Sequence, residues 1–144
     1  MSTHTSDIAS IGFVYIPFDP SDPTIGETIR YDQFVQRLLK KQSKELMLAH
    51  CGLGVTGEAG ELADAIKRDI IYGHTHTPEG KTIRAAIVEE LGDLEFYMQA
   101  TRQLYEIPQQ EVLQHNALKL SDRYKGLAYT DLAAAVRADK QEKK

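Results

Sequence analysis

Two pairs of acidic residues stand out because the members of each pair are three positions apart. Glu58 and Glu61 lie in Gly-Glu-Ala-Gly-Glu-Leu, and Glu90 and Asp93 lie in Glu-Glu-Leu-Gly-Asp-Leu. Residues three apart on a helix share one face, so each pair projects two carboxylates in one direction. Like charges at this spacing destabilise a helix by a few tenths of a kcal/mol unless something compensates them. Two such pairs among small and apolar neighbours therefore predict a bound cation between them.

The cation that fits this donor set is Mg²⁺, for which Mn²⁺ can substitute. Hard divalent ions prefer oxygen ligands, and four carboxylates can hold more than one ion. Residues 62–89 separate the pairs, which is enough chain to finish one helix, turn and return antiparallel with the second pair facing the first. The alternative is that the acids are solvated surface residues. A di-iron centre is disfavoured because it requires Glu-x-x-His on two helices, and this sequence has no Glu followed by His at that spacing.

A third group of polar residues lies further along the chain, in Asn116-Ala-Leu-Lys119-Leu-Ser-Asp-Arg123-Tyr124. Asn116, Lys119 and Arg123 fall on one helical stripe. Two cations and an amide on one stripe can contact phosphate oxygens. The alternative is that the two cations only balance the carbonyl groups at the end of a helix.

Taken in order, these three segments resemble the MazG-like, all-α nucleoside triphosphate pyrophosphohydrolases. The family pattern is Glu-x-x-Glu, a spacer, Glu-x-x-Asp, and then Asn-x-x-Lys-Leu-x-x-Arg-Tyr. The resemblance covers about residues 30–127. One departure is Gly57, at a position where the family commonly carries an additional Glu.

The resemblance implies Mg²⁺-dependent hydrolysis of a (deoxy)nucleoside triphosphate to the monophosphate and pyrophosphate. A purine deoxynucleotide such as dGTP is one candidate substrate. It implies metal ligation by all four acids, with Glu58 or Glu61 accepting a proton from the attacking water. It also implies substrate contacts from the third segment and assembly into a homodimer or homotetramer. The residues to which it gives these roles are Glu58, Glu61, Glu90, Asp93, Asn116, Lys119, Arg123 and Tyr124.

Three further residues are candidates for substrate binding, each with a structural alternative. Arg68 follows Glu61 by seven residues and can supply another cation, or it can pair with Asp64. Tyr97 follows Asp93 by one helical turn and can stack on a base, or it can pack in the core. His50 precedes the first acidic pair and can contact the ligand, or it can be a packed histidine.

The elements that would position these residues are mostly helical. Apolar residues near a 3.6-residue period predict helices over residues 27–42, 44–72, 82–105 and 108–124, followed by a short helix over 131–140. A break in the second helix near Cys51 to Gly54 is one option, because glycines cluster there. The sequence thus predicts an all-α fold of the four-helix-bundle type. Residues 72–80 form a loop by composition.

The two ends of the chain differ from this helical body. Residues 1–25 contain Ile-Gly-Phe-Val-Tyr-Ile-Pro-Phe and three prolines at spacings of three, which predicts an extended arm that covers a seam on the body or on a partner subunit. We therefore divide the chain into an arm (1–25), a helical catalytic domain (26–127), and a C-terminal helix with a charged tail (128–144).

Composition excludes several classes of protein. The chain has 144 residues, enough for one domain, and a formal net charge of −4, which argues against a nucleic-acid binder with a broadly basic surface. Its single cysteine excludes an intrachain disulfide and a cysteine-rich zinc site. No apolar run is long enough for a membrane span, and the first ten residues lack the pattern of a signal peptide. We expect a cytoplasmic protein without a membrane partner.

Two other functions compete with the pyrophosphohydrolase. The chain can be a non-catalytic helical module that binds a nucleotide or a protein without turnover. It can also act on phosphoribosyl-ATP, with the same chemistry on a different substrate. The full set of four acids argues against the first, because a scaffold has no use for carboxylates set among apolar residues.

Overall fold

A computed structural model of the chain describes residues 12–17, 21, 26–137 and 140. The described part is mostly helical, which confirms the expected all-α class. The chain divides into two compact units, residues 1–105 and residues 106–144, and each is described by itself.

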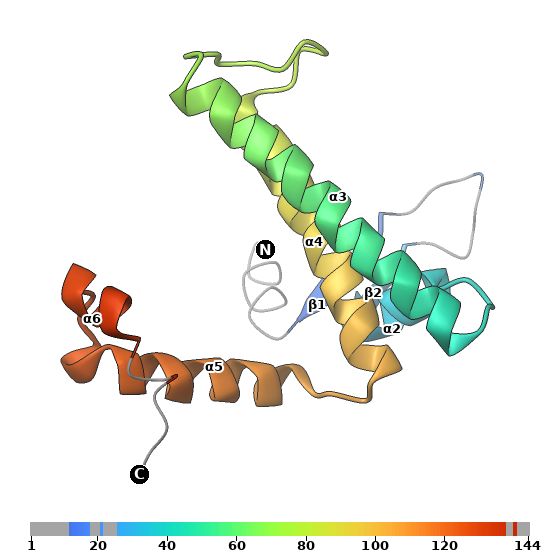
Figure 1. Cartoon of the computed structure of the whole chain (residues 1–144). Helices are drawn as coiled ribbons and strands as arrows, with labels where there is room; N and C mark the ends of the chain where they lie inside the picture. Colours follow the sequence, from blue (N-terminus) through green and yellow to red (C-terminus); the bar gives the residue numbers. More distant parts are fainter. Residues whose placement is uncertain (1–11, 18–20, 22–25, 138–139, 141–144) are drawn as a thin grey trace, which may run out of the picture. The chain divides into compact units, whose positions relative to one another are not determined.

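The first unit is built around a pair of long antiparallel helices, α3 (Lys44–Ile70) and α4 (Ile83–Leu104). Figure 1 shows the two helices side by side along most of their length. The shorter helix α2 (Tyr31–Leu38) packs against α4. Two strands, β1 (Phe13–Tyr15) and β2 (Thr28–Arg30), form an antiparallel ribbon before α2.

The long helices begin where the sequence supplies capping side chains. The Ser43 hydroxyl accepts a hydrogen bond from the Leu46 amide at 3.4 Å, and the Thr82 hydroxyl accepts one from the Ala85 amide at 3.2 Å. Such caps satisfy amide groups that the first turn of a helix leaves without a carbonyl partner. The loop between the helices turns at Gly73 and Gly80, whose positive φ angles suit glycine. The predicted loop over residues 72–80 is therefore confirmed.

Helix α3 runs without a break through its four glycines, so the break considered near Cys51 does not occur. At Gly54 the absence of a side chain has a structural reason, because the ring of Tyr97 from α4 lies directly against the backbone there. A glycine that costs about 1 kcal/mol in isolation is retained where a neighbouring helix needs the space.

The prediction of one helix over residues 27–42 is wrong at both ends. Thr28–Arg30 is a strand, because Ile29 pairs with Val14 across the ribbon and is buried there. The helix then ends at Leu38, since Leu39 is already extended. The described part of the predicted arm is indeed extended, and it pairs with β2 of its own chain. The remainder of the arm lies outside the described residues.

The core of the first unit is small. Val35, Cys51 and Ala100, one from each of the three helices, are almost fully buried and in contact. Partly buried side chains surround them, most of them aromatic: Tyr31, Phe34, Leu39, Phe96, Tyr97 and Leu104. This core fixes α2 and α3 against α4, the arrangement on which the candidate site depends.

The second unit contains α5 (Gln109–Arg123), a 3₁₀ turn η1 (Lys125–Leu127) and α6 (Asp131–Val136). Helix α5 follows Pro108, and the chain turns at Gly126, whose φ of 70° suits glycine. The expected helix over 131–140 is shorter than predicted, because Arg137 adopts a left-handed conformation after Val136.

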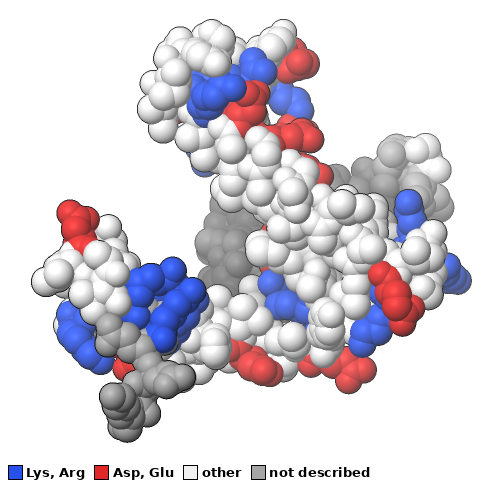
Figure 2. Space-filling view, in the orientation of Figure 1, with Lys and Arg blue, Asp and Glu red and all other residues white. Residues whose placement is uncertain are grey.

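The length and apolar character of the helices bear on membrane insertion, and the charges on the surface bear on charged partners. Among the described helices, none combines the length and the apolar character that a membrane span requires. Figure 2 shows basic and acidic side chains interspersed on the visible face, and the middle of α3 is largely uncharged there.

Candidate functional site

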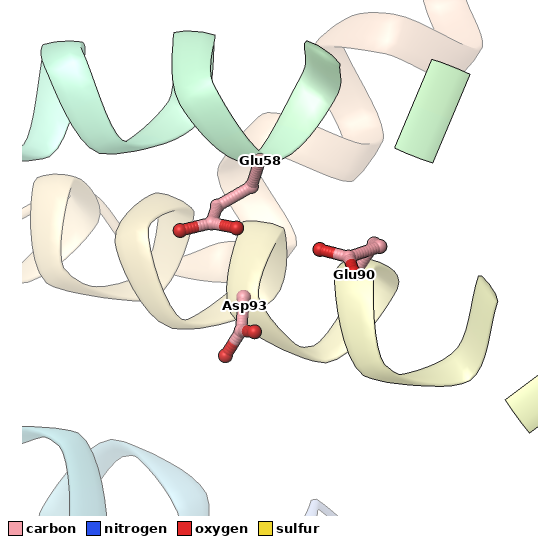
Figure 3. A group of neighbouring side chains, drawn as sticks. All are labelled: Glu58, Glu90 and Asp93. Carbon is pink, nitrogen blue, oxygen red and sulfur yellow. The ribbon is translucent and has the colours of Figure 1, made fainter. Parts of the chain in front are cut away.

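Three of the four predicted acids meet between the two long helices. Glu58 of α3 and Glu90 and Asp93 of α4 each offer a carboxylate oxygen, and these oxygens all lie within 4.8 Å of one another. Figure 3 shows Glu58 extending from α3 toward α4, where Glu90 and Asp93 lie one turn apart. The expectation that the two pairs face each other is met by these three residues.

The electrostatic state of this group reflects crowding of like charge. The pKa of Glu58 is raised by partial desolvation and by the charges of Asp93 and Glu61, although a hydrogen bond with Glu90 acts in the opposite direction. The pKa of Glu90 is raised by desolvation and then by the charges of Glu61 and Glu58. Carboxylates that raise each other's pKa are the arrangement that a cation would relieve.

Glu61 lies beside this group without belonging to it. Its side chain is exposed, and its charge acts on both Glu58 and Glu90. Glu61 is thus part of the same electrostatic cluster, although it is not one of the three residues whose oxygens converge.

Nearby basic residues pair with other acids. The Arg68 guanidinium donates to the Asp64 carboxylate at 2.6 Å, and Lys67 contacts the same carboxylate. Lys81 pairs with Glu89, the neighbour of Glu90 in the sequence. The ion pair with Asp64, one of the two arrangements considered for Arg68, is therefore the one present.

The three converging residues fit a hard divalent cation. All three donors are carboxylate oxygens, the ligand type that Mg²⁺ and Mn²⁺ prefer. Around an octahedral Mg²⁺ with ligands at about 2.1 Å, adjacent oxygens are about 3 Å apart, so the three side chains would draw closer together than their present 4.8 Å limit to share one ion. The remaining positions around such an ion are open to water and substrate oxygens.

An aromatic pocket adjoins the acidic group. It has a volume of about 480 Å³, and its lining includes Glu58 and Asp93. The other lining residues come from α2 and α4: Tyr31, Phe34, Leu38, Gly92, Phe96 and Tyr97. The pKa of Tyr31 is raised by burial and by the charges of Glu95 and Asp93, which places its phenol close to the acidic side of the pocket.

Tyr97 packs in the core, one of the two roles considered for it, and its stacking on a base remains a prediction. Its ring packs against the buried core and also lines the pocket. His50 is exposed, and its ring meets the Tyr97 ring edge-on with centroids 5.5 Å apart. His50 therefore touches a wall of the pocket without lining it.

The pocket as a whole was not predicted from the sequence. Tyr31 and Phe34 are three apart and share a helix face, a signal that could have indicated an aromatic wall. Their proximity to Asp93 depends on how α2 docks on α4, which periodicity does not reveal.

The residues of the third predicted segment lie in the second unit. Asn116 and Lys119 are exposed on α5, and Arg123 and Tyr124 are half-buried at its end, where the guanidinium lies over the Tyr124 ring. Their expected contacts with phosphate remain predictions.

A comparison with family models identifies the relationship. The MazG nucleotide pyrophosphohydrolase domain matches residues 42–128, a segment that contains both acidic pairs and α5. The chain belongs to this family. No curated protein and no solved structure gave a match. Helix α2 and the strands precede the matched MazG segment, so the Tyr31 and Phe34 wall of the pocket lies outside it.

Proposed function

We propose that this MazG-domain protein hydrolyses a (deoxy)nucleoside triphosphate to the nucleoside monophosphate and pyrophosphate. The observation that carries the proposal is the convergence of Glu58, Glu90 and Asp93 within the segment that matches the family. In the reaction, a bond forms between the water oxygen and phosphorus, and the bond from that phosphorus to the pyrophosphate oxygen breaks.

The proposed cofactor is Mg²⁺, with Mn²⁺ as a substitute, held by Glu58, Glu90 and Asp93 and by Glu61 if its side chain turns inward. When bound, such an ion supplies positive charge to phosphate oxygens and lowers the pKa of a coordinated water. Desolvation, together with the charges of neighbouring carboxylates, raises the pKa values of Glu58 and Glu90, and the part that comes from like charge is physical support for a cation at this position.

The chain's own residues would orient and deprotonate the attacking water. Glu58 or Glu61 would accept the proton, and Glu61 is favoured because it lies beside the converging group without being one of its three members. A fixed base saves the entropic cost of bringing one from solution.

The developing charge on the leaving pyrophosphate requires cations. We propose that Lys119 and Arg123 contact it, with Asn116 and Tyr124 completing the substrate contacts from the same helix end. Arg68 could join them only by leaving its ion pair with Asp64.

The base of the nucleotide would enter the aromatic pocket. Its aromatic walls offer flat apolar surface for stacking, while a cation held by Glu58 and Asp93 in the same lining would keep the phosphate end next to the acids. Tyr97 is the proposed stacking residue, and His50 would act by supporting its ring. A purine deoxynucleotide such as dGTP is the proposed substrate class.

A substrate panel tests the proposal. The full chain is incubated with each common NTP and dNTP and with phosphoribosyl-ATP, with Mg²⁺ or Mn²⁺, and the products are separated by chromatography. We expect a nucleoside monophosphate and pyrophosphate in equal amounts from at least one dNTP. Release of orthophosphate and a diphosphate would contradict the proposed bond cleavage. A rise in melting temperature with nucleotide but no turnover would instead support the non-catalytic binding module.

A further inference from the structure

A side chain of α4 lies unusually close to the backbone of α3 at Gly54. A Cβ atom built on Gly54 would lie 2.5 Å from Cε1 and Cζ of Tyr97, far inside the 3.5–4.0 Å at which carbon atoms normally make contact. The Tyr97 ring therefore lies directly on the backbone of α3. Gly52, Gly57 and Gly60, on the same helix, have nothing within 4 Å of the corresponding position.

The surroundings of Tyr97 determine where its ring would move if residue 54 had a side chain. The ring packs against the core of Val35, Cys51 and Ala100, and it meets Phe96 edge-on at 5.4 Å between centroids. Protein cores are close-packed and resist displacement. The aromatic pocket that Tyr97 lines offers room for a ring displaced from Gly54.

We propose that Gly54 sets the width of the base pocket and thereby the size of the base that the enzyme accepts. Gly54 acts through Tyr97, so it is a positioning residue. A Tyr97 ring displaced toward the Tyr31 and Phe34 wall would narrow the pocket, and a narrower pocket disfavours the larger purine bases. This inference rests on the proposed function, because it assigns the pocket to the base of the hydrolysed nucleotide.

Gly54→Ala tests the inference, with Gly52→Ala as the matched control. Both variants add one methyl group to α3, but only the first meets the Tyr97 ring. For each protein, kcat/KM is measured with dGTP and dATP and with dCTP and dTTP. We expect Gly54→Ala to lower the purine-to-pyrimidine ratio of kcat/KM by about tenfold, the scale of effect of one methylene in a fitted pocket. The ratio in Gly52→Ala should remain that of the wild type.

A general loss of stability would lower kcat/KM for purine and pyrimidine substrates together and leave their ratio unchanged. A change in the ratio therefore indicates a change in pocket width. An unchanged ratio in folded Gly54→Ala overturns the inference while leaving the pyrophosphohydrolase proposal intact. Absence of hydrolysis by the wild type would overturn both.

Tyr97→Leu provides a second route. Leu at position 97 removes the ring that a Cβ at position 54 would meet, so the double variant should fold even if Gly54→Ala alone does not. Its purine-to-pyrimidine ratio should equal that of Tyr97→Leu. A ratio that falls on Gly54→Ala equally in the presence and absence of the ring would show that Tyr97 does not transmit the effect, and the inference would be wrong.

Discussion

Glu89 and Glu90 are neighbours in the sequence with the same side chain, yet their surroundings differ. Glu89 pairs with Lys81, whereas Glu90 faces Glu58 across the two helices and lies close to Asp93 on its own helix. The two side chains have different neighbours because adjacent residues on a helix point about 100° apart. The chemistry proposed for this protein depends on that difference, and Glu89 is therefore a natural control for Glu90.

The raised pKa values of Glu58 and Glu90 predict a specific pH dependence. Above the ordinary value of 4.5, the folded metal-free protein holds protons that the unfolded chain has lost, so its stability falls as pH rises through the folded-state pKa values. Glu90→Gln removes one of these groups. We expect its melting temperature relative to wild type, measured in EDTA, to increase between pH 4 and pH 7.

Glu89→Gln makes the same change in charge but breaks an ion pair, so its melting temperature relative to wild type should increase less over this range. A difference between Glu90→Gln and wild type that stays constant with pH would contradict the crowding that we describe.

At the scale of elements, the caps and the glycines explain why the helix bounds could be predicted. Ser43, Thr82 and Pro108 mark the starts of α3, α4 and α5, all within a residue or two of expectation. Each capping signal involves only residues that are neighbours in the chain, so the start of a helix can be predicted from the sequence alone. Strand β2 was missed because its pairing with β1 joins residues far apart in the chain, and Tyr31–Leu38 alone reads as part of a longer helix.

The cap of α4 gives a prediction about stability. Thr82→Ala removes the hydroxyl that accepts from the Ala85 amide, and we expect it to lower the free energy of unfolding by about 1 kcal/mol. Thr82→Ser keeps an oxygen in the same position and should retain most of that stability. Urea denaturation measures both. Equal losses in the two variants would mean that the cap does not stabilise the start of α4.

At the scale of the whole molecule, the first unit exposes more apolar surface than its small core explains. Leu53 on α3 is 76% exposed, and Val88, Leu91 and Met98 form an exposed stripe along α4. Exposed apolar surface on this scale is typical of subunit contacts. The shared helix face of each acidic pair could be predicted from the spacing of the residues. The pocket and any subunit contact depend on how separate helices or subunits pack together, which no single segment of the sequence determines.

The exposed stripe predicts self-association. We expect the full chain to elute with the mass of a homodimer or homotetramer in light scattering, and Val88→Lys with Met98→Lys to shift it toward a smaller species. Glu89→Lys changes the charge at an exposed position of α4 that points away from the stripe, and it should leave the mass unchanged. A wild-type chain that is monomeric at micromolar concentration would contradict this expectation.

We propose that the carboxylates brought together from α3 and α4 bind the divalent ion on which pyrophosphate release depends. The most direct measurement is the rate of pyrophosphate release as a function of Mg²⁺ concentration for wild type, Asp93→Asn and Glu89→Gln. We predict that Asp93→Asn loses about a hundredfold or more in rate at low Mg²⁺ while its helical circular dichroism is retained. Glu89→Gln should follow the wild-type curve. Superimposable curves for wild type and Asp93→Asn would contradict the account.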